Sequence, residues 1–305
     1  MSDGAPLVSV CIPTYNYRHY LLEAVESALA QTQQNIEIVV VDNASTDGTI
    51  ELLSELSARD RRIRFVRNPT NLGMTANFNR CLELAEGKYI KFLCADDVLS
   101  AKCVERMADI AERHPEVSLV GCARYLFDDR KRVVGQRGYS RAPLVADGRK
   151  IIADCFFSGN LIGEPTAVLF RNDDRARRFN LGYTQLLDLE LWFRLLESGA
   201  FAFIPEALCG IRQHAAQGTG ENLRAGRVVT DKVLLFDQFA GKQHGSLLRK
   251  LRWDARMASS IVRQGRVATG SALPDDVRDA VYHPGLVRAV MIPALRAARA
   301  IRGVR

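Results

Sequence analysis

Short apolar, β-branched runs alternate with helix-like segments over the first 121 residues, and this alternation restricts the fold more than any other feature. The runs predict strands at Leu7–Ile12, Ile36–Val41, Ile63–Val66, Tyr89–Cys94 and Val117–Gly121. The segments between them predict helices near Tyr20–Ala30, Gly48–Ala58, Ala76–Ala85 and Ala101–Arg113. Hydrophobicity is continuous within the runs, as in Ile38–Val41, which is typical of strands covered by helices on both faces. The pattern therefore predicts an α/β fold with a mixed, mainly parallel central sheet flanked by helices.

The second half of the chain changes character twice. Residues 130–149 are polar and Gly-rich, which predicts a long loop or hairpin over the sheet edge. Further elements are expected as a helix near Lys150–Phe157, a strand at Ala167–Arg171, a helix near Gln185–Glu197 and a strand at Phe201–Ile204. From about Asn222 the pattern is almost wholly helical. We therefore predict an α/β domain over residues 1–220 and a helical, basic C-terminal extension over residues 221–305.

Positive charge is concentrated in this extension. Residues 241–305 contain 13 Lys and Arg against 4 Asp and Glu, and this surplus exceeds the net charge of +7 of the whole chain. A basic tail indicates an anionic partner such as a membrane surface or a nucleic acid, or else a solvated basic face. Nucleic acid is disfavoured because few aromatic residues accompany the charges.

Leu295, Ala298 and Ile301 lie directly before Arg296, Arg299 and Arg302, a spacing that predicts an amphipathic basic helix on an anionic membrane. Packing or oligomer contacts are the alternative for residues 285–305. We read no secretory signal and no run of about 18 apolar residues. The seven cysteines have no zinc-ligand spacing and are predicted to be reduced, mostly buried thiols. The body is therefore expected in the cytoplasm, with the tail at the inner face of the membrane.

Ligands of open α/β sheets bind beyond the carboxyl ends of the strands, so polar residues at these ends are the first site candidates. The first strand ends in Pro13-Thr14-Tyr15-Asn16, which offers an aromatic face and small polar groups for a base, or else forms an ordinary turn with an Asn cap. The second strand ends at Asp42, where a carboxylate could accept the N–H of uracil or thymine. Thr46 or Asp47 is expected to cap the helix that follows.

Two adjacent carboxylates, Asp96 and Asp97, follow the fourth strand. They repel each other unless a cation or a helix N-terminus lies nearby. Mg²⁺ or Mn²⁺ bound to a diphosphate would supply that charge. The alternative is that both residues simply start the helix at Ala101.

Two later segments carry further candidates. Asp188 falls in the first turn of the predicted helix at 185–197, where the helix dipole favours a carboxylate. Glu190 and Arg194 are expected to form a surface pair at i,i+4 spacing. Near the end of the domain, Arg212 could neutralise a phosphate and His214 could complete a metal shell, although a lone histidine is more often structural.

Taken together, these motifs resemble the inverting family 2 glycosyltransferases of the GT-A fold. Matching segments are Pro13–Asn16, Val41–Thr49, the acidic motif ending in Asp96-Asp97, the Asn-x-Gly segment Asn71–Gly73, the helix segment Gln185–Leu195 and the ending Cys209–His214. Cys94 and Leu187 stand where the family commonly has acidic residues. The resemblance implies nucleotide binding by Pro13, Thr14, Tyr15, Asn16, Asp42, Asn71, Asp96 and Arg212, a metal held by Asp96, Asp97 and His214, and Asp188 as the general base.

The resemblance further implies an enzyme that moves a sugar from a nucleoside-diphosphate sugar, of UDP or dTDP type, to a hydroxyl of a saccharide or lipid-linked acceptor. It also points to bacterial cell-surface polysaccharide or glycolipid synthesis. A catalytically silent sugar-nucleotide-binding or scaffold protein is the alternative. Cys94 and Leu187 favour it, whereas Asp96, Asp97 and Asp188 count against it. A dinucleotide or P-loop enzyme is disfavoured because neither Gly-x-Gly-x-x-Gly after the first strand nor a Walker A segment is present.

Overall fold

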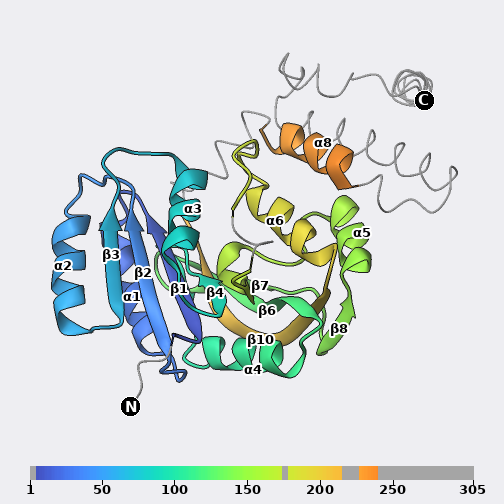
Figure 1. Ribbon diagram of the computed structural model, residues 1–305, viewed down its shortest axis with the longest axis horizontal. Helices are drawn as coiled ribbons and strands as arrows, with labels where there is room; N and C mark the ends of the chain where they lie inside the picture. Colours follow the sequence, from blue (N-terminus) through green and yellow to red (C-terminus); the bar gives the residue numbers. More distant parts are fainter. Residues whose placement is uncertain (1–4, 174–177, 215–226, 240–305) are drawn as a thin grey trace, which may run out of the picture. The chain divides into compact units, whose positions relative to one another are not determined.

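The computed structural model describes residues 5–173, 178–214 and 227–239. A single mixed sheet contains all of the described strands (Figure 1). Its strands are β1 Val8–Thr14, β2 Ile36–Asp42, β3 Ile63–Arg67, β4 Tyr89–Phe92, β5 Val98–Leu99, β6 Val117–Asp128, β7 Val133–Arg137, β8 Leu144–Asp147, β9 Val168–Arg171 and β10 Ala200–Gln213. The helices are α1 Arg18–Leu29, α2 Thr49–Arg59, α3 Met74–Leu84, α4 Cys103–Arg113, α5 Gly148–Ser158, α6 Leu187–Leu196 and α8 Arg227–Phe239, with a short 3₁₀ turn, η1, at Pro165–Ala167.

The order of the sheet is β3-β2-β1-β4-β9-β6-β10-β5, with β7 added to β6 and β8 added to β10. β3, β2, β1 and β4 run parallel to one another, as expected of strands joined by helices. β9 runs antiparallel to both β4 and β6 and so connects this half of the sheet to the parallel pair β6 and β10. The predicted α/β fold with a central sheet flanked by helices is confirmed.

Burial explains the continuous hydrophobic runs. All seven residues of β1 are buried, and β2 is buried except at Glu37. α3 packs on β1 and β2, and α4 packs on β6. Each fully buried Val or Ile contributes about 1.5–3 kcal/mol relative to an exposed one. Register aligns Thr14 with Asp42, so the carboxyl ends of β1 and β2 lie at the same edge.

Two strands extend further than the sequence predicts. The strand expected at Val117–Gly121 continues to Asp128, and the one expected at Phe201–Ile204 continues to Gln213. Pro205 and Glu206 break the apolar pattern of β10, but register shifts at these positions let the strand keep pairing with β6. The predicted loop or hairpin at 130–149 contains β7 and β8, which pair with β6 and β10.

Residues up to Cys155, with Asn160–Leu181 and Leu187–His214, form one compact unit. Residues Phe156–Gly159, Gly182–Leu186 and the chain from Ala215 onward belong to a second unit, of which α8 is the described helix. Residues 285–305, for which a membrane helix was expected, lie outside the described residues. Within the described residues, every helix is too short or too polar to cross a bilayer. All seven cysteines are free thiols, and all except Cys94 are buried.

Candidate active site

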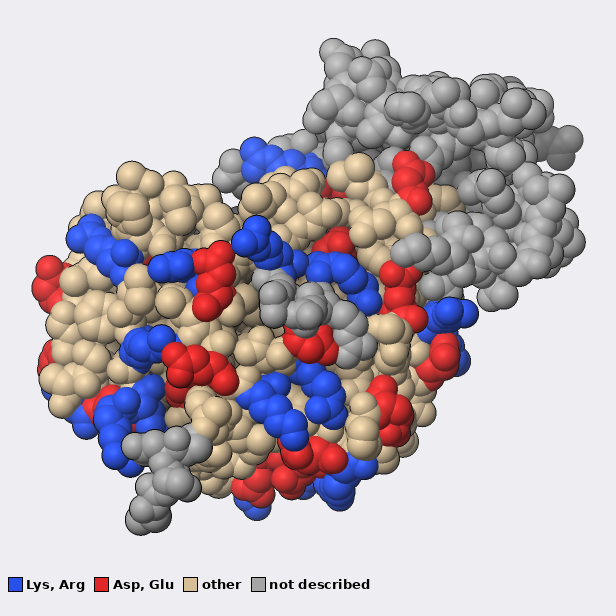
Figure 2. Space-filling view, in the orientation of Figure 1, with Lys and Arg blue, Asp and Glu red and all other residues tan. Residues whose placement is uncertain are grey.

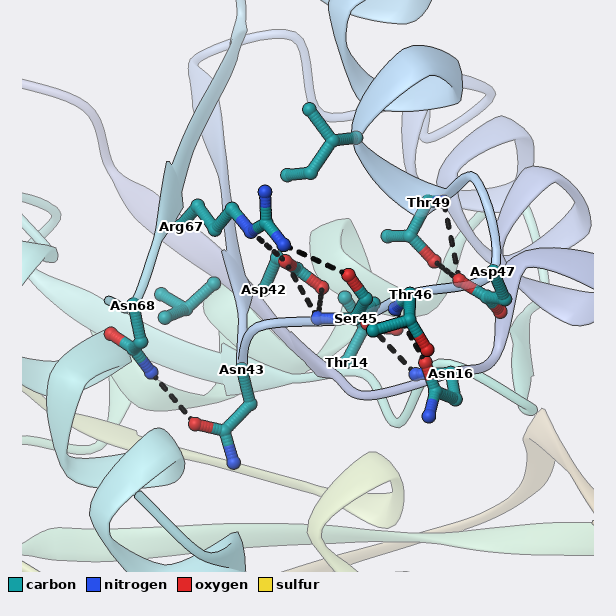
Figure 3. A network of polar contacts seen from close by, with 12 residues as sticks. Thr14, Asn16, Asp42, Asn43, Ser45, Thr46, Asp47, Thr49, Arg67 and Asn68 are labelled. Carbon is teal, nitrogen blue, oxygen red and sulfur yellow. Dashed lines mark hydrogen bonds and ion pairs between the residues drawn. The ribbon is translucent and has the colours of Figure 1, made fainter. Parts of the chain in front are cut away.

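The loops that follow β1 and β2 are joined into one surface by side-chain hydrogen bonds (Figure 3). The backbone N–H of Asn16 donates to Ser45 Oγ at 2.8 Å, and Asn16 Oδ1 accepts from the N–H of Thr46 at 2.8 Å. Asn16 has a φ of 54°, a left-handed conformation that asparagine tolerates better than most residues. Asp47 accepts from the N–H of Arg18 and of Thr49, the first residues of α1 and α2. The N-cap of α2 is Gly48, with a φ of 83°, and not Thr46 or Asp47 as expected. Asn16 therefore shapes these loops, and its contact with nucleotide stays a prediction.

Asp42 lies at the centre of this surface and is fully buried. Its two carboxylate oxygens accept the Ser45 N–H at 3.1 and 3.3 Å, and Arg67 Nε lies 3.6 Å from Oδ2. Because a carboxylate has about four acceptor positions, Asp42 keeps capacity for a further donor. Arg67 ends β3 directly beside Asp42, and its guanidinium is half exposed. Arg67 was not predicted from the sequence as a site residue, although it is the last residue of a strand, as Asp42 is.

Other residues predicted to bind nucleotide lie at the carboxyl end of β1, where Thr14 is aligned with Asp42. Thr14 Oγ1 is buried and has no hydrogen-bond partner among the described residues. Such an orphan hydroxyl is uncommon in folded proteins and fits a position that a ligand completes. Tyr15 is 43% exposed and offers an open ring, while Pro13 is buried at the end of β1.

Four asparagines hold the loop at 71–73 against the ends of β1 and β2. Asn43 Nδ2 donates to Asn71 Oδ1 at 2.7 Å, and Asn43 Oδ1 accepts from Asn68 Nδ2 at 2.9 Å. Asn77 on α3 accepts from Asn68 and donates to the Val41 carbonyl at 3.1 Å. The Asn71 side chain thus orients this loop in the structure, and a direct contact with nucleotide stays a prediction.

The two acidic residues after β4 have different surroundings. Asp97 is buried, and both its oxygens accept protein donors: Thr166 Oγ1–H at 2.6 Å and the backbone N–H of Arg212 at 3.0 Å. Burial, together with the nearby Asp96, raises the pKa of Asp97 well above its ordinary value. The chain enters β5 directly after Asp97, so the pair does not start the helix that follows, in contrast to the alternative considered above.

Asp96 instead faces His214. His214 Nε2 lies 3.0 Å from Asp96 Oδ2, and the histidine ring packs against Tyr17 and Tyr20 at centroid distances of 5.8 and 5.1 Å. No described group of three or more His, Cys, Asp or Glu side chains could hold a metal. Mg²⁺ and Mn²⁺ commonly take only one or two protein ligands, with water and substrate phosphates completing the shell. Asp96 and His214 fit that requirement. Each oxygen of Asp97 accepts one protein donor, and a contact of Asp97 with the metal stays a prediction.

Arg212 is placed differently from the phosphate contact expected of it. Its guanidinium donates to the Asp96 carbonyl at 2.9 Å and pairs with Glu23 at 2.8 Å. The same group lies between the rings of Tyr20 and Phe127, at 4.6 and 4.5 Å. With its backbone N–H on Asp97, Arg212 holds the acidic turn in shape.

Cys94 takes the first position of the acidic motif without supplying charge. Burial, followed by the charges of Asp97 and Asp96, raises the pKa of this thiol well above its ordinary value, so it stays protonated. Its backbone N–H donates to Thr166 Oγ1 at 3.0 Å. Thr166 therefore links Cys94 to Asp97. The fully buried Lys91 in turn donates to the carbonyls of Thr166 and Val168.

Asp188 lies in the first turn of α6 and remains partly exposed. Its Oδ2 accepts from Asn160 Nδ2 at 2.9 Å, and its Oδ1 accepts from the Leu189 N–H at 2.7 Å. Loss of surrounding water, with a smaller contribution from the charge of Glu164, raises the pKa of Asp188 to about 7. A carboxylate with a pKa near neutral is suited to take a proton at physiological pH.

Asn160 was not identified from the sequence. Its side chain donates to and accepts from Gly163, which closes a tight turn, and the Gly163 carbonyl accepts the Trp192 indole N–H at 3.2 Å. Gly163 has a φ of 136°, which other residues rarely adopt. The turn thus fixes Asn160 against α6.

The expectation that Glu190 forms a surface pair is wrong in one respect. Glu190 does pair with Arg194 at 3.0 Å, but it is only 1% exposed. The reason is that α6 is buried on most of its circumference, from Leu187 to Leu196, so this helix has little solvent face.

Glu190→Gln is therefore expected to lower the free energy of unfolding by about 1–3 kcal/mol, because the substitution weakens a buried charge-assisted hydrogen bond. Urea denaturation of the variant and the parent protein would measure this difference. Equal stability would contradict the assignment of Glu190 to the packing of α6.

On the face shown in Figure 2, Lys and Arg side chains are interspersed with Asp and Glu over the described residues. A mixed surface agrees with the near-neutral charge of the chain before residue 241.

A family model and known glycosyltransferases are similar to this chain in sequence. The family model described as Glycosyl transferase family 2 matches residues 9–175. The putative teichuronic acid biosynthesis glycosyltransferase TuaG of Bacillus subtilis (strain 168) is 30% identical over 205 residues, which cover 67% of this chain and 77% of TuaG.

Solved structures share the fold at low identity. The S. aureus TarS 1–349 complex with UDP-GlcNAc has a TM-score of 0.63 at 18% identity, covering 96% of this chain and 87% of that one. In another TarS crystal structure the match covers 52% of the TarS chain, so this chain spans about half of it. The Pyrobaculum calidifontis mannosyltransferase PcManGT, in complex with GDP-Man and Mn²⁺, has a TM-score of 0.57 at 17% identity, with 99% and 88% covered.

Proposed function

The chain belongs to glycosyltransferase family 2, and from this premise we propose that it transfers a sugar from a nucleoside-diphosphate sugar to an acceptor hydroxyl with inversion at the anomeric carbon. The observation that carries this proposal is Asp188, a partly exposed carboxylate with a pKa near 7 that is held by Asn160. The enzyme is of the GT-A type, with its strand ends arranged as a nucleotide surface.

The pair of Asp42 and Arg67 supports a uracil or thymine base. Each of these bases has an N–H donor flanked by two carbonyl acceptors, so a carboxylate beside a guanidinium is complementary to this edge. Tyr15, 43% exposed, would stack on the base, and the orphan hydroxyl of Thr14 would gain a partner. UDP or dTDP sugars are therefore the proposed donors.

Asp96 and His214 would hold Mg²⁺ or Mn²⁺, which would supply positive charge to the leaving diphosphate. Asp97, Thr166 and Arg212 keep the acidic turn in place around this position. The phenol of Tyr17 stays neutral, because burial and the charge of Asp96 raise its pKa to about 12.

Asp188 takes the proton of the acceptor hydroxyl while the oxygen of that hydroxyl forms a bond to the anomeric carbon. The bond from that carbon to the nucleoside diphosphate breaks, and the electron pair leaves with the diphosphate. One displacement at one carbon inverts its configuration. A positioned base contributes about 10²–10⁴-fold to such a step.

TuaG, named for teichuronic acid biosynthesis, supports a saccharide or lipid-linked acceptor in cell-surface polymer synthesis. A place for the enzyme at the inner face of the membrane belongs to the same proposal and depends on the basic tail.

Turnover with a panel of UDP, dTDP and GDP sugars tests the function. We expect a uracil or thymine nucleotide to be released in the presence of Mn²⁺, and NMR of the product to show the anomeric configuration opposite to that of the donor. Nucleotide binding without turnover of any donor would favour the catalytically silent alternative. Retained configuration would rule out a single displacement.

A further inference from the structure

Three consecutive backbone N–H groups ahead of α6 converge on one carboxylate oxygen. Thr184, Gln185 and Leu186 donate to Asp231 Oδ2 at 3.0, 2.6 and 2.8 Å. Asp231 belongs to α8 and is 2% exposed. These residues lie in the same compact unit, although they are 45 to 47 positions apart in the chain.

The contact anchors the segment that leads into α6. Of the three donors only Leu186 adjoins the first residue of this helix, and Thr184 and Gln185 lie further ahead. The helix has Asp188 and Glu190 in its own first turn, where the helix dipole favours negative charge. Asp231 adds a buried carboxylate that holds the backbone just before this end. A second bond, from Tyr183 Oη–H to Gln238 Oε1 at 2.9 Å, ties the same segment to α8.

The segment runs directly into the proposed base. Leu186 is followed by Leu187, the first residue of α6, and then by Asp188. A shift at the start of α6 therefore moves the Asp188 carboxylate relative to Asn160, and misplacement by about 1 Å can cost about 10²-fold in rate.

We propose that Asp231 is a positioning residue: α8 fixes the start of the helix that carries the base, which makes the C-terminal extension necessary for transfer but not for nucleotide binding. This inference rests on the proposed function, in which Asp188 takes the proton. It assigns the extension a role in the chemistry, separate from any contact with a membrane.

Asp231→Asn tests this role, because the near-isosteric amide removes the negative charge while retaining an acceptor oxygen. We expect kcat to fall about tenfold or more at saturating donor, using the donor that the turnover panel identifies, while the Kd of UDP with Mn²⁺ is unchanged. Hydrogen exchange of residues 183–190 should become faster. Asp237 is an exposed carboxylate on the same helix, so Asp237→Asn is the control for loss of charge on α8 and should lower kcat much less than Asp231→Asn.

Unchanged kcat in Asp231→Asn would overturn the inference, as would a parallel loss of UDP binding, since Asp231 would then support the fold in general. If Asp231→Asn does not fold, Asp231→Glu is the alternative variant, because it keeps the charge and moves it by one methylene. An intermediate kcat of Asp231→Glu with unchanged UDP affinity supports the inference. A kcat equal to that of the parent protein overturns it. Asp188→Asn separates the two proposals. If Asp188→Asn is fully active, the proposed function fails; if it is inactive while Asp231→Asn is fully active, the role of Asp231 alone fails.

Discussion

Asp188→Asn is expected to lower kcat by about 10²-fold or more, because the amide cannot accept a proton from the acceptor hydroxyl at neutral pH. The affinity for nucleotide should barely change, since the proposed contacts with the nucleobase and the diphosphate are made by Tyr15, Asp42 and Asp96. The measurement is kcat at saturating donor, with the Kd of UDP obtained separately by calorimetry.

Asp188→Glu should also lose much of the rate, because one extra methylene displaces the carboxylate from the position that Asn160 gives it. Glu190→Gln is the control on the same helix and should retain most of kcat at a temperature where it is folded. An inactive Glu190→Gln beside an active Asp188→Asn would show that the base has been assigned to the wrong residue.

The pKa of Asp188 adds a pH dependence to the same comparison. The carboxylate is the active form, so kcat should fall as the pH is lowered through about 7. The folded state disfavours the charged form of Asp188, so ionisation of this residue lowers the free energy of unfolding. This loss grows between about pH 4 and pH 7 and is complete above pH 7. Asp188→Asn should therefore raise Tm at pH 8 and change it little at pH 4. A variant less stable than the parent at pH 8 would contradict the raised pKa.

Removal of divalent metal is expected to weaken UDP binding by about tenfold or more, since the diphosphate would otherwise lie beside the Asp96 carboxylate without a compensating charge. Calorimetric titration of UDP with Mn²⁺ and with EDTA measures the difference. Asp96→Asn should bind UDP with little dependence on Mn²⁺, because it loses a proposed ligand of the ion.

Thr166→Val is a suitable companion, because it removes a donor to Asp97 without changing Asp96 or His214. It should lower stability more than it lowers the response to Mn²⁺. Equal UDP affinity with and without metal in the parent protein would remove the ion from the site.

The placement of several candidate residues could be predicted because parallel strands bring their carboxyl ends to one edge. Asp42 and the turn holding Asp96 were found in this way, from strand ends alone. The role of Asp97 was not, because its neighbours Thr166 and Arg212 reach it from 69 and 115 positions away. Glu190 was misplaced because helical periodicity does not show that α6 is packed on nearly all sides.

Asn160 and Asp231 could not be selected from the sequence for a related reason. The tertiary structure brings the side chain of each residue to its partners: Asn160 lies on the turn at Gly163, and Asp231 lies on α8. Neither has a motif of its own. The length of β10 was missed because Pro205 and Glu206 conceal a strand that bulges but continues.

The residues that contact the acidic turn at Asp96 and Asp97 lie far from it along the chain, and this has a consequence for synthesis of the protein. Contacts around Asp42 involve residues within the first 77 positions, whereas Asp96 meets His214 across 118 positions. During translation the nucleotide loops can acquire their native contacts while β10 is still unmade, but the pairing of Asp96 with His214 must wait for residue 214 to leave the ribosome. The nascent chain would thus have the loops after β1 and β2 in their native contacts while the acidic turn still lacks Thr166, Arg212 and His214.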